Sequence, residues 1–257
     1  EAELWFQNAP DEQLILANFC YYLKQSDHYN EKLFLVTPQE DIGRLSPQAV
    51  TLLDLPRVAL GREHIEAGAA LWEAYSAPDP QKLYDYLANK NIKIPEFRLT
   101  ALKVLNELPH PTNTLGKTEL LLLALIPRTG VSRLQLWINY QFPNPSPTYS
   151  QSAVDEFLLK NLSLTREPAI TGYLPQPPWK PADNFEAALA RSREEQTWRE
   201  STLYLTDFGQ ELFERKKRFS DFNLIDRWVG GIHITNQNLW VWNSEFSKID
   251  HLIGGTF

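Results

Sequence analysis

Two residue types are almost missing from this chain of 257 residues. It has one cysteine, Cys20, and no methionine, not even at the first position. A single cysteine excludes a disulfide within the chain, which fits a protein of a reducing compartment. A chain of this composition normally carries several methionines, so we expect the natural protein to contain residues that this sequence lacks.

Long apolar runs are also missing. The longest, residues 120–126, is far shorter than the roughly 20 residues that cross a bilayer, and it has the length of a core helix. The first residues, Glu1-Ala2-Glu3, have neither the basic region nor the apolar segment of a signal peptide. We therefore expect a cytoplasmic protein with no contact to a membrane.

Positive charge is scarce as well, because the formal net charge is −7 at pH 7. DNA affinity rests largely on cations that neutralise phosphates, so this balance disfavours nucleic acid as a partner. The one basic run, residues 215–218, is expected to end a helix, where positive charge is favoured and usually solvated.

The linear motifs of common enzymes are missing too. The chain contains no G-x-S-x-G, H-E-x-x-H, C-x-x-C, P-loop or G-x-G-x-x-G sequence. These patterns mark many hydrolases, zinc enzymes, redox proteins and nucleotide-binding proteins. We expect no cofactor and no bound metal, and the sequence leaves open whether the protein is an enzyme.

Apolar and aromatic residues are plentiful by contrast. Hydrophobic residues make up 43% of the chain, which includes 8 Trp, 10 Tyr and 13 Phe. This composition predicts a packed core rather than a disordered chain. The length fits one large domain or two modest ones.

The N-terminal stretch has the pattern of a strand, a helix and a strand. Residues 3–6 are apolar and aromatic, and residues 33–36 form a second apolar run. Between them, Leu16, Phe19 and Cys20 follow helical spacing within residues 12–24. The order predicts a parallel βαβ crossover.

Ligands of parallel sheets bind beyond the carboxyl ends of the strands. Here that position falls on residues 7–13 and on the residues after Val36. The candidate ligand-binding residues of this loop are Asn8, Asp11, Glu12 and Gln13. The alternative is that residues 8–11 only turn the chain and cap the following helix, since Asn, Pro and Asp are ordinary turn and cap residues.

A helical stretch follows and ends at a predicted domain boundary. Ser46-Pro47 and Asp79-Pro80 have the pattern of helix starts, and residues 65–72 have helical periodicity. The segment 108–113 contains two prolines around a histidine, which end the preceding helix. We expect a first domain over residues 1–108 and a second over residues 109–257.

The second domain is predicted to begin with three helices, near residues 118–126, 134–138 and 150–162. The third is expected to bury the apolar residues Val154, Phe157, Leu158 and Leu162. A strand near 170–173, a proline-rich insertion over 175–200 that contains a helix, a strand at 203–205 and a helix from 206 to about 217 follow. Three helices followed by a strand pair resemble a winged helix, whose third helix often enters the major groove of DNA. That helix carries Lys160 against Asp155 and Glu156, so a winged helix used for protein contact is the alternative.

The C-terminal segment combines two glycines with aromatic and charged residues. Gly230-Gly231 permits a tight turn, and residues 232–241 alternate as in a hairpin across residues 235–238. A candidate surface for an anion or a planar group is formed by Asp226, Arg227, Trp228, His233 and Trp242. The alternative is that Asp226 and Arg227 tie the hairpin to the preceding segment while the tryptophans fill a core.

The same segment carries a family resemblance. Residues 205–212 (LTDFGQEL), 225–234 (IDRWVGGIHI) and 240–243 (WVWN) resemble the C-terminal part of bacterial proteins of the domain of unknown function 1835 family, with a terminal pattern similar to the domain of unknown function 3658. The resemblance implies a bacterial protein and brings no established activity. Where the family has Glu-His-Asp, this chain has Gln7-Asn8-Ala9, and it lacks the family's N-terminal segment.

The fold class predicted overall is an α/β N-terminal unit with parallel strands, followed by helices and a winged-helix-like α+β domain with a terminal β-hairpin. An interaction or regulatory protein, with a protein partner or with self-association, is the first prediction for function. A DNA-binding regulator and a small-ligand-binding protein or enzyme that uses the loop of residues 7–13 are the alternatives. A basic surface on the third helix favours the first alternative, and a deep pocket at the loop favours the second.

Overall fold

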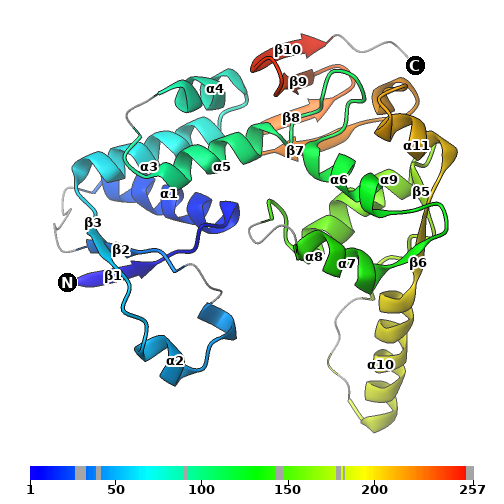
Figure 1. Cartoon of the computed structure of the whole chain (residues 1–257), viewed down its shortest axis with the longest axis horizontal. Helices are drawn as coiled ribbons and strands as arrows, with labels where there is room; N and C mark the ends of the chain where they lie inside the picture. Colours follow the sequence, from blue (N-terminus) through cyan, green and yellow to red (C-terminus); the bar gives the residue numbers. More distant parts are fainter. Residues whose placement is uncertain are drawn as a thin grey trace. The chain divides into compact units, whose positions relative to one another are not determined.

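The computed structural model describes residues 1–26, 33–38, 42–89, 92–142, 147–177, 181 and 183–252. The chain forms two compact units (Figure 1). The first unit comprises Glu1–Asn106 and Trp228–His233, and the second comprises Glu107–Arg227 and Ile234–Phe257. Within the described ranges, no helix has the length and apolar character needed to cross a membrane.

The first unit opens with the predicted crossover. Strand β1 (Ala2–Trp5) is followed by helix α1 (Pro10–Lys24) and strand β2 (Leu33–Val36). The two strands are parallel, with Ala2 opposite Leu33 and Trp5 opposite Val36, which confirms the prediction. A third strand that the sequence pattern did not indicate, β3 (Arg57–Ala59), pairs antiparallel with β2, so the sheet order is β1-β2-β3.

The helices of the first unit bury their apolar faces against one another. They are η1 (Ile42–Arg44), α2 (Pro47–Thr51), α3 (Arg62–Tyr75), α4 (Gln81–Ala88) and α5 (Pro95–Leu105). Helices α1, α3 and α5 lie side by side (Figure 1). Gly68 of α3 lies so close to Cys20 of α1 that an added Cβ would be 2.7 Å from the Cys20 Cβ. Burial raises the pKa of the Cys20 thiol to about 12, so it stays a neutral core group.

The two helix starts predicted in this unit differ in detail. The Ser46 hydroxyl accepts a hydrogen bond from the Ala49 N–H at 3.2 Å, as a cap of α2 should. Helix α4 begins one residue after Pro80, and its first N–H, that of Gln81, donates to the Asp79 carboxylate at 2.8 Å. The Ser46 cap is confirmed, whereas Pro80 precedes its helix instead of opening it.

The Gly-Gly pair joins strands β7 (Asp226–Val229) and β8 (Ile232–Thr235), which form a two-stranded sheet. Gly230 has a φ of 59°, a conformation that favours glycine. The Gly231 N–H donates to the Tyr75 carbonyl at 2.8 Å, and a Cβ on Gly231 would lie 2.1 Å from the Ser76 carbonyl oxygen. Both glycines are therefore needed where the hairpin tip meets the end of α3.

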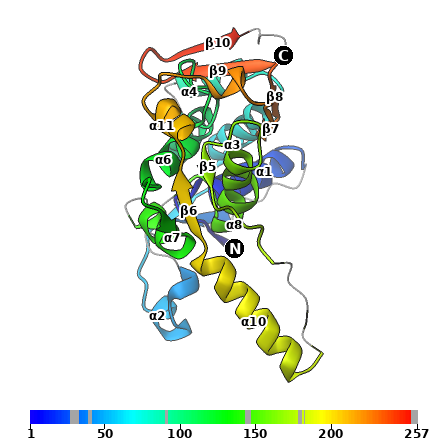
Figure 2. The same ribbon diagram turned by 90° about the vertical axis from the view of Figure 1, so that its right-hand side faces the viewer.

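The second unit begins with helix α6 (Lys117–Leu125), strand β4 (Val131–Ser132) and helix α7 (Arg133–Gln141). A continuous helical segment, α8 (Gln151–Ala153), η2 (Val154–Leu159) and α9 (Lys160–Ser163), follows. Next come β5 (Ile170–Thr171), α10 (Phe185–Glu200) and β6 (Thr202–Leu205). Strand β6 pairs antiparallel with both other strands, which gives the sheet order β4-β6-β5. Helix α10 extends away from the rest of this unit (Figure 2).

The middle of the third helical segment is π-helical, which the periodicity of the sequence did not predict. A π-helical turn is wider than an α-helical one, so it changes which side chains share a face. Val154, Leu158 and Leu162 are buried as predicted, but Asp155 is buried with them. Phe157 was predicted on the buried face and is instead 61% exposed.

The C-terminal part of the second unit contains α11 (Asp207–Phe213), η3 (Phe219–Asp221), β9 (Leu239–Asn243) and β10 (Lys248–Leu252). Helix α11 ends before the basic run of residues 215–218, so the expectation that this run ends a helix was wrong; Arg215 has a φ of 59°. Thr235 and Asn238 form a turn in which each N–H donates to the other residue's carbonyl at 3.2 Å. The strands on either side of this turn, β8 and β9, belong to two different sheets, so they do not form the strand pair of the predicted hairpin. Strand β9 then pairs antiparallel with β10.

Candidate functional site

The loop after β1 uses its polar side chains to hold its own backbone. The Gln13 amide donates to the Gln7 carbonyl at 2.7 Å, and the Glu12 carboxylate accepts the Gln7 N–H at 2.5 Å. Asp11 is exposed and accepts the N–H of Glu12 at 3.0 Å. Asn8 is half-buried; Ala9, which cannot cap with its side chain, precedes the first turn of α1.

One atom of this loop stands out. The Gln13 side chain is buried, and among the described residues its Oε1 has no hydrogen-bond partner. Thr37 and Pro38 follow β2, whereas residues 39–41, also part of the predicted strand-end site, lie outside the described residues. The Gln13 amide nitrogen and the carboxylates of Glu12 and Asp11 form local bonds that fix the start of α1.

The candidate residues at the C-terminal segment fall into separate places. Trp228 and His233 stack in the first unit with ring centroids 4.5 Å apart and an angle of 7° between planes. Trp228 is 63% exposed, so this pair offers a flat aromatic surface. Trp242 is buried in the second unit, where its backbone N–H donates to the Pro109 carbonyl at 2.9 Å, so it contributes to a core.

Arg227 belongs to a buried charge network that the sequence did not reveal. Its Nη1 lies 2.5 Å from Glu119 Oε2, which also accepts the Gly116 N–H at 2.7 Å. Its Nη2 lies 3.5 Å from the Glu107 carbonyl oxygen. The Glu107 carboxylate accepts bonds from Thr118, at 2.6 Å from the hydroxyl and 3.2 Å from the N–H. The start of α6 is thus capped by two buried carboxylates.

Burial decides the electrostatics of this network. Glu107 is 3% exposed, and desolvation raises the pKa of its carboxyl to about 7 although Thr118 and Arg227 oppose the rise. Burial also works against the charge of Arg227, but Glu119 and further groups outweigh it and raise the pKa of the guanidinium. The network therefore pairs one permanent cation with two carboxyls, of which Glu107 titrates near neutral pH.

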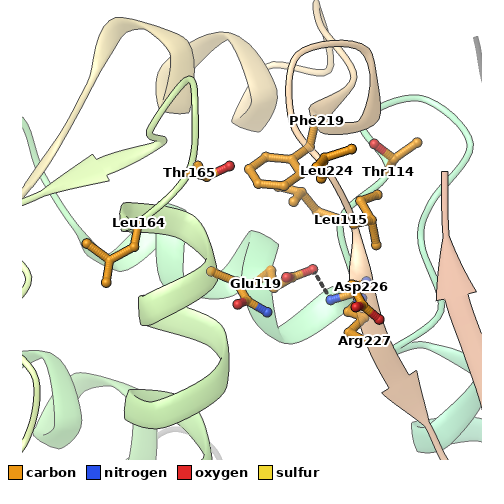
Figure 3. Close-up of a pocket in the computed structure, with 11 residues that line it drawn as sticks. Thr114, Leu115, Glu119, Leu164, Thr165, Phe219, Leu224, Asp226 and Arg227 are labelled. Atoms are coloured by element: carbon orange, nitrogen blue, oxygen red, sulfur yellow. Dashed lines mark ion pairs between the residues drawn. The ribbon is translucent and has the colours of Figure 1, made fainter. Parts of the chain in front are cut away.

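A cavity of about 140 Å³ lies beside the Glu119–Arg227 ion pair (Figure 3). Segments after α9, around η3 and at the start of β7 surround it, and α6 contributes Glu119. Its polar lining consists of Thr114, Glu119, Asn161, Thr165, Asp226 and Arg227. Its apolar lining consists of Leu115, Leu164, Phe219, Leu224 and Ile225. Of the residues predicted for the C-terminal surface, Asp226 and Arg227 meet here.

A second hollow, of about 410 Å³, lies at the base of α10. This groove, called the α10-base groove below, is lined by residues of α7, by residues 150–152, by Gln176 and by Glu195, Trp198 and Arg199 of α10. Leu134 and Trp137 are its apolar residues from α7. The groove therefore combines an apolar wall with a polar rim.

Arg133, which also lines this groove, forms a buried ion pair with Asp155. The side chains of Arg133 and Asp155 are each 4% exposed and are in direct contact. The Arg133 guanidinium lies over the rings of Tyr173 and Trp198, 5.1 Å and 4.9 Å from their centres, and donates to the Leu174 carbonyl at 2.8 Å. Burial lowers the pKa of Arg133 and raises the pKa of Asp155. Arg133 thus fixes α7, the third helical segment and the base of α10 to one another.

Basic side chains do not gather on the third helical segment. Its sequence from residue 151 to residue 163 has one cation, Lys160. The cations of the run 215–218 are each paired with a carboxylate, at 2.9 Å, 2.5 Å, 2.7 Å and 3.2 Å in chain order. In the part of the chain that the structure describes, no group of three or more His, Cys, Asp or Glu is placed to hold a metal ion.

No family model, curated protein or solved structure matches this chain. The resemblance to the domain of unknown function 1835 family therefore stays a prediction.

Proposed function

We propose that this protein is an interaction protein that self-associates through α10 and the α10-base groove of a winged-helix-like second unit. The order helix, strand, helix, helix, strand, strand supports a winged helix, as does the sheet order β4-β6-β5. In such a fold the connection between β5 and β6 is the wing. Here that connection carries α10, so the wing has become a helical arm.

The observation that carries the proposal is the exposure of this arm. Of its 16 residues, all of which the structure describes, only Trp198 near the base is buried. A helix of this length extends about 24 Å. Helices of proteins gain most of their stability from packing an apolar face, so an arm with so little packing has reason to bind another surface.

The tip of the arm carries the apolar side chains for such a contact. Phe185 is 81% exposed and Leu189 is 42% exposed. They are four residues apart and so share one face of the helix. Near the base, Leu134 and Trp137 of the α10-base groove offer an apolar wall.

A second copy of the chain is the occupant that fits both features. Two arms packed antiparallel about a two-fold axis place the tip of each beside the base of the other. Phe185 and Leu189 of each copy then enter the α10-base groove of its partner. Both contacts form at once, because a two-fold interface uses the same surface on both copies.

The apolar area is of the right order. A stable interface buries about 800 Å² on each partner. A Phe side chain buries roughly 150–250 Å², and Phe142, Phe157 and Phe185 of the second unit are each more than half exposed. The exposed parts of Leu134, Ile138 and Leu189 add to this surface.

DNA binding is the weaker alternative for this unit. A recognition helix needs cations toward the phosphates, whereas the third helical segment exposes Phe157 and Glu156 beside Lys160. A cytoplasmic bacterial protein of the domain of unknown function 1835 family remains part of the proposal on the strength of its sequence pattern.

Sedimentation velocity over a wide concentration range tests the proposal. We expect a concentration-dependent dimer for the wild type and a monomer for the variant Phe185→Glu/Leu189→Glu. Both side chains are exposed, so the variant should be as stable as the wild type at low concentration, where the wild type is also monomeric. Phe246→Glu, at a position that is 76% exposed in the turn between β9 and β10, is the matched control and should still dimerise. A wild type that stays monomeric at high concentration would overturn the proposal, as would a dimer that tolerates the double substitution.

A further inference from the structure

Two polar atoms at the α10-base groove are buried without a hydrogen-bond partner among the described residues. Trp198, which lines the groove, is 6% exposed, and no acceptor bonds to its Nε1. Asp155 is 3% exposed, and no donor bonds to its Oδ2. Buried polar side-chain atoms nearly always have a partner, so a bound molecule that supplies one acceptor and one donor would complete this region.

Arg133 holds both residues in place. Its Nη1 contacts Asp155 Oδ1, and its guanidinium lies over the Trp198 ring at 4.9 Å from the ring centre. Its Nε donates to the Ser201 hydroxyl at 3.2 Å, and its Nη2 donates to the Leu174 carbonyl at 2.8 Å. All three nitrogens of this guanidinium are therefore engaged, and they fix the Trp198 indole and the Asp155 carboxylate close to one another.

Each of the two residues lines a hollow. The groove that Trp198 lines has a volume of about 410 Å³, within the range of roughly 300–1,000 Å³ that is usual for ligand pockets. Asp155 lines a smaller hollow of about 20 Å³, which shares Arg133, Trp137 and Gln151 with the groove. The small hollow has room for only one small donor group, so the body of a ligand has to lie in the groove.

The peptide amide is the chemical group that suits both atoms. An indole N–H only donates, so it needs an acceptor such as a carbonyl, whereas an ionised carboxylate oxygen only accepts and needs an N–H or O–H. Each non-proline residue of a peptide carries both a carbonyl and an N–H. In a helix these groups bond to one another, so the peptide has to be extended to offer them.

The wall of the groove favours an apolar side chain on this peptide. Leu134 and Trp137 line the groove from α7, and because they are three residues apart they share one face of that helix. Leu134 is 51% exposed and so has apolar surface left to bury. Residues 150–152 and Gln176 form the polar rim, which can bond to further amides of the same peptide.

We propose that the α10-base groove binds an extended peptide segment of another protein, with an apolar side chain against Leu134 and Trp137. A carbonyl of the peptide accepts the Trp198 N–H, and a peptide N–H donates to Asp155 Oδ2. Phe185 and Leu189 of a second copy use the same groove, so the bound peptide displaces them and opposes dimerisation. Only this last consequence rests on the proposed self-association.

A small amide tests the binding directly. N-acetyl-leucinamide has peptide amides and one apolar side chain, and N-acetylglycinamide is the control that lacks the side chain. Each is titrated into Phe185→Glu/Leu189→Glu, in which no arm competes for the groove, while the indole N–H signals are followed by NMR. The Trp198 signal is identified by its loss in Trp198→Phe.

We expect N-acetyl-leucinamide to move the Trp198 signal saturably and downfield, as a new hydrogen bond does. N-acetylglycinamide should bind about tenfold more weakly, because it buries no Leu side chain. A Trp198 signal that does not respond to N-acetyl-leucinamide would overturn the proposal. Equal affinity of the two amides would overturn the assigned apolar wall.

A substitution of Trp198 tests the assigned donor. Trp198→Phe keeps an aromatic ring over Arg133 but lacks the N–H, so N-acetyl-leucinamide should bind about fivefold more weakly, as expected for one hydrogen bond. Trp228→Phe, at an exposed position of the first unit, is the matched control and should bind as before. Unchanged affinity in Trp198→Phe would contradict the assignment.

Sedimentation velocity of the wild type with N-acetyl-leucinamide tests the competition. We expect the dimer to dissociate as the amide saturates the groove, whereas a dimer that persists at saturation would overturn the competition. A wild type that is monomeric without the amide would contradict self-association and leave the NMR test of peptide binding unaffected.

Discussion

The two units satisfy their buried polar groups in different ways. In the loop of the first unit, Gln13 and Glu12 bond to the backbone of Gln7, six and five residues away. In the second unit, Arg227 reaches the Glu107 carbonyl 120 residues away and pairs with Glu119. Local bonds of the first kind fix the shape of a loop. Bonds of the second kind join segments that are far apart in the sequence and bury charged side chains together.

Breaking the buried Arg133–Asp155 ion pair should give the largest loss of stability. Arg133→Ala leaves the Asp155 carboxylate buried without its partner, so we expect a loss of about 3–5 kcal/mol in the free energy of unfolding. Arg57 of the first unit forms exposed pairs with Glu1 and Glu3, and Arg57→Ala should cost far less stability, because solvent screens exposed pairs. Urea unfolding of both variants measures the contrast, and equal losses would erase it.

The same pair also allows a compensated variant. Because burial raises the pKa of Asp155 and lowers that of Arg133, solvation lost on folding outweighs the attraction between them. Arg133→Met/Asp155→Leu should therefore recover most of the stability lost in Arg133→Ala. A double variant as unstable as Arg133→Ala would show that the hydrogen bonds of Arg133 matter more than its charge.

Glu107 should make stability depend on pH near neutrality. Its pKa is about 7 in the folded protein against 4.5 ordinarily, so the folded state binds more protons between these values. Stability therefore falls as pH rises from about 4.5 to 7, by an amount on the order of 3 kcal/mol from this group. Glu107→Gln should lack this component while keeping an oxygen for Thr118.

The measurement is the free energy of unfolding of wild type and Glu107→Gln at several pH values across this range. Other titrating groups are common to both proteins and cancel in the difference. Glu186→Gln, at an exposed position of α10, serves as the control and should follow the wild type. Parallel curves for wild type and Glu107→Gln would place the titration elsewhere.

The loop of the first unit should give a smaller and purely structural effect. Gln13→Ala removes the bond to the Gln7 carbonyl, so we expect a loss of about 1–2 kcal/mol. Glu12→Ala should cost about 1 kcal/mol, since its carboxylate caps the loop from a half-buried position. Denaturant unfolding detects both losses. Unchanged stability of both variants would show that these bonds do not hold the loop.

We expect the protein not to bind DNA at all. Fluorescence anisotropy of a random duplex, titrated with the protein at low salt and then near physiological salt, checks this. We expect no saturable rise, because the exposed face of the third helical segment lacks clustered cations. Saturable binding that weakens steeply with salt would restore the DNA-binding alternative.

Local patterns predicted much of the fold. The parallel crossover followed from two apolar runs around a helical stripe at Leu16 and Cys20, which need only neighbours in sequence. The third helical segment was located, but its π-helical turn shifted the register and exposed Phe157. The end of α11 was misplaced because the positive φ of Arg215 leaves no signal in a basic run.

The candidate sites were harder to predict, because their residues come from segments that are far apart in the sequence. Arg227 and Asp226 were singled out from the sequence pattern, yet Glu119, the partner of Arg227, lies in α6, far away in the sequence. Glu119 had a local signal, since it stands three residues after Gly116 and accepts its N–H as the third residue of a capping box does. Glu107 had no such signal. The cavity is lined by residues from several segments that are far apart in the sequence. Spacing along the chain does not predict which of these segments come together.

A disulfide between copies tests the central claim most directly. Cys20 is buried and does not interfere, so single cysteines can be placed at the arm tip and at the groove as Phe185→Cys and Leu134→Cys. Antiparallel arms predict that a mixture of the two variants forms a cross-linked dimer under mild oxidation, while Phe185→Cys alone forms almost none. Cross-linking by Phe185→Cys alone, or none in the mixture, would contradict the account.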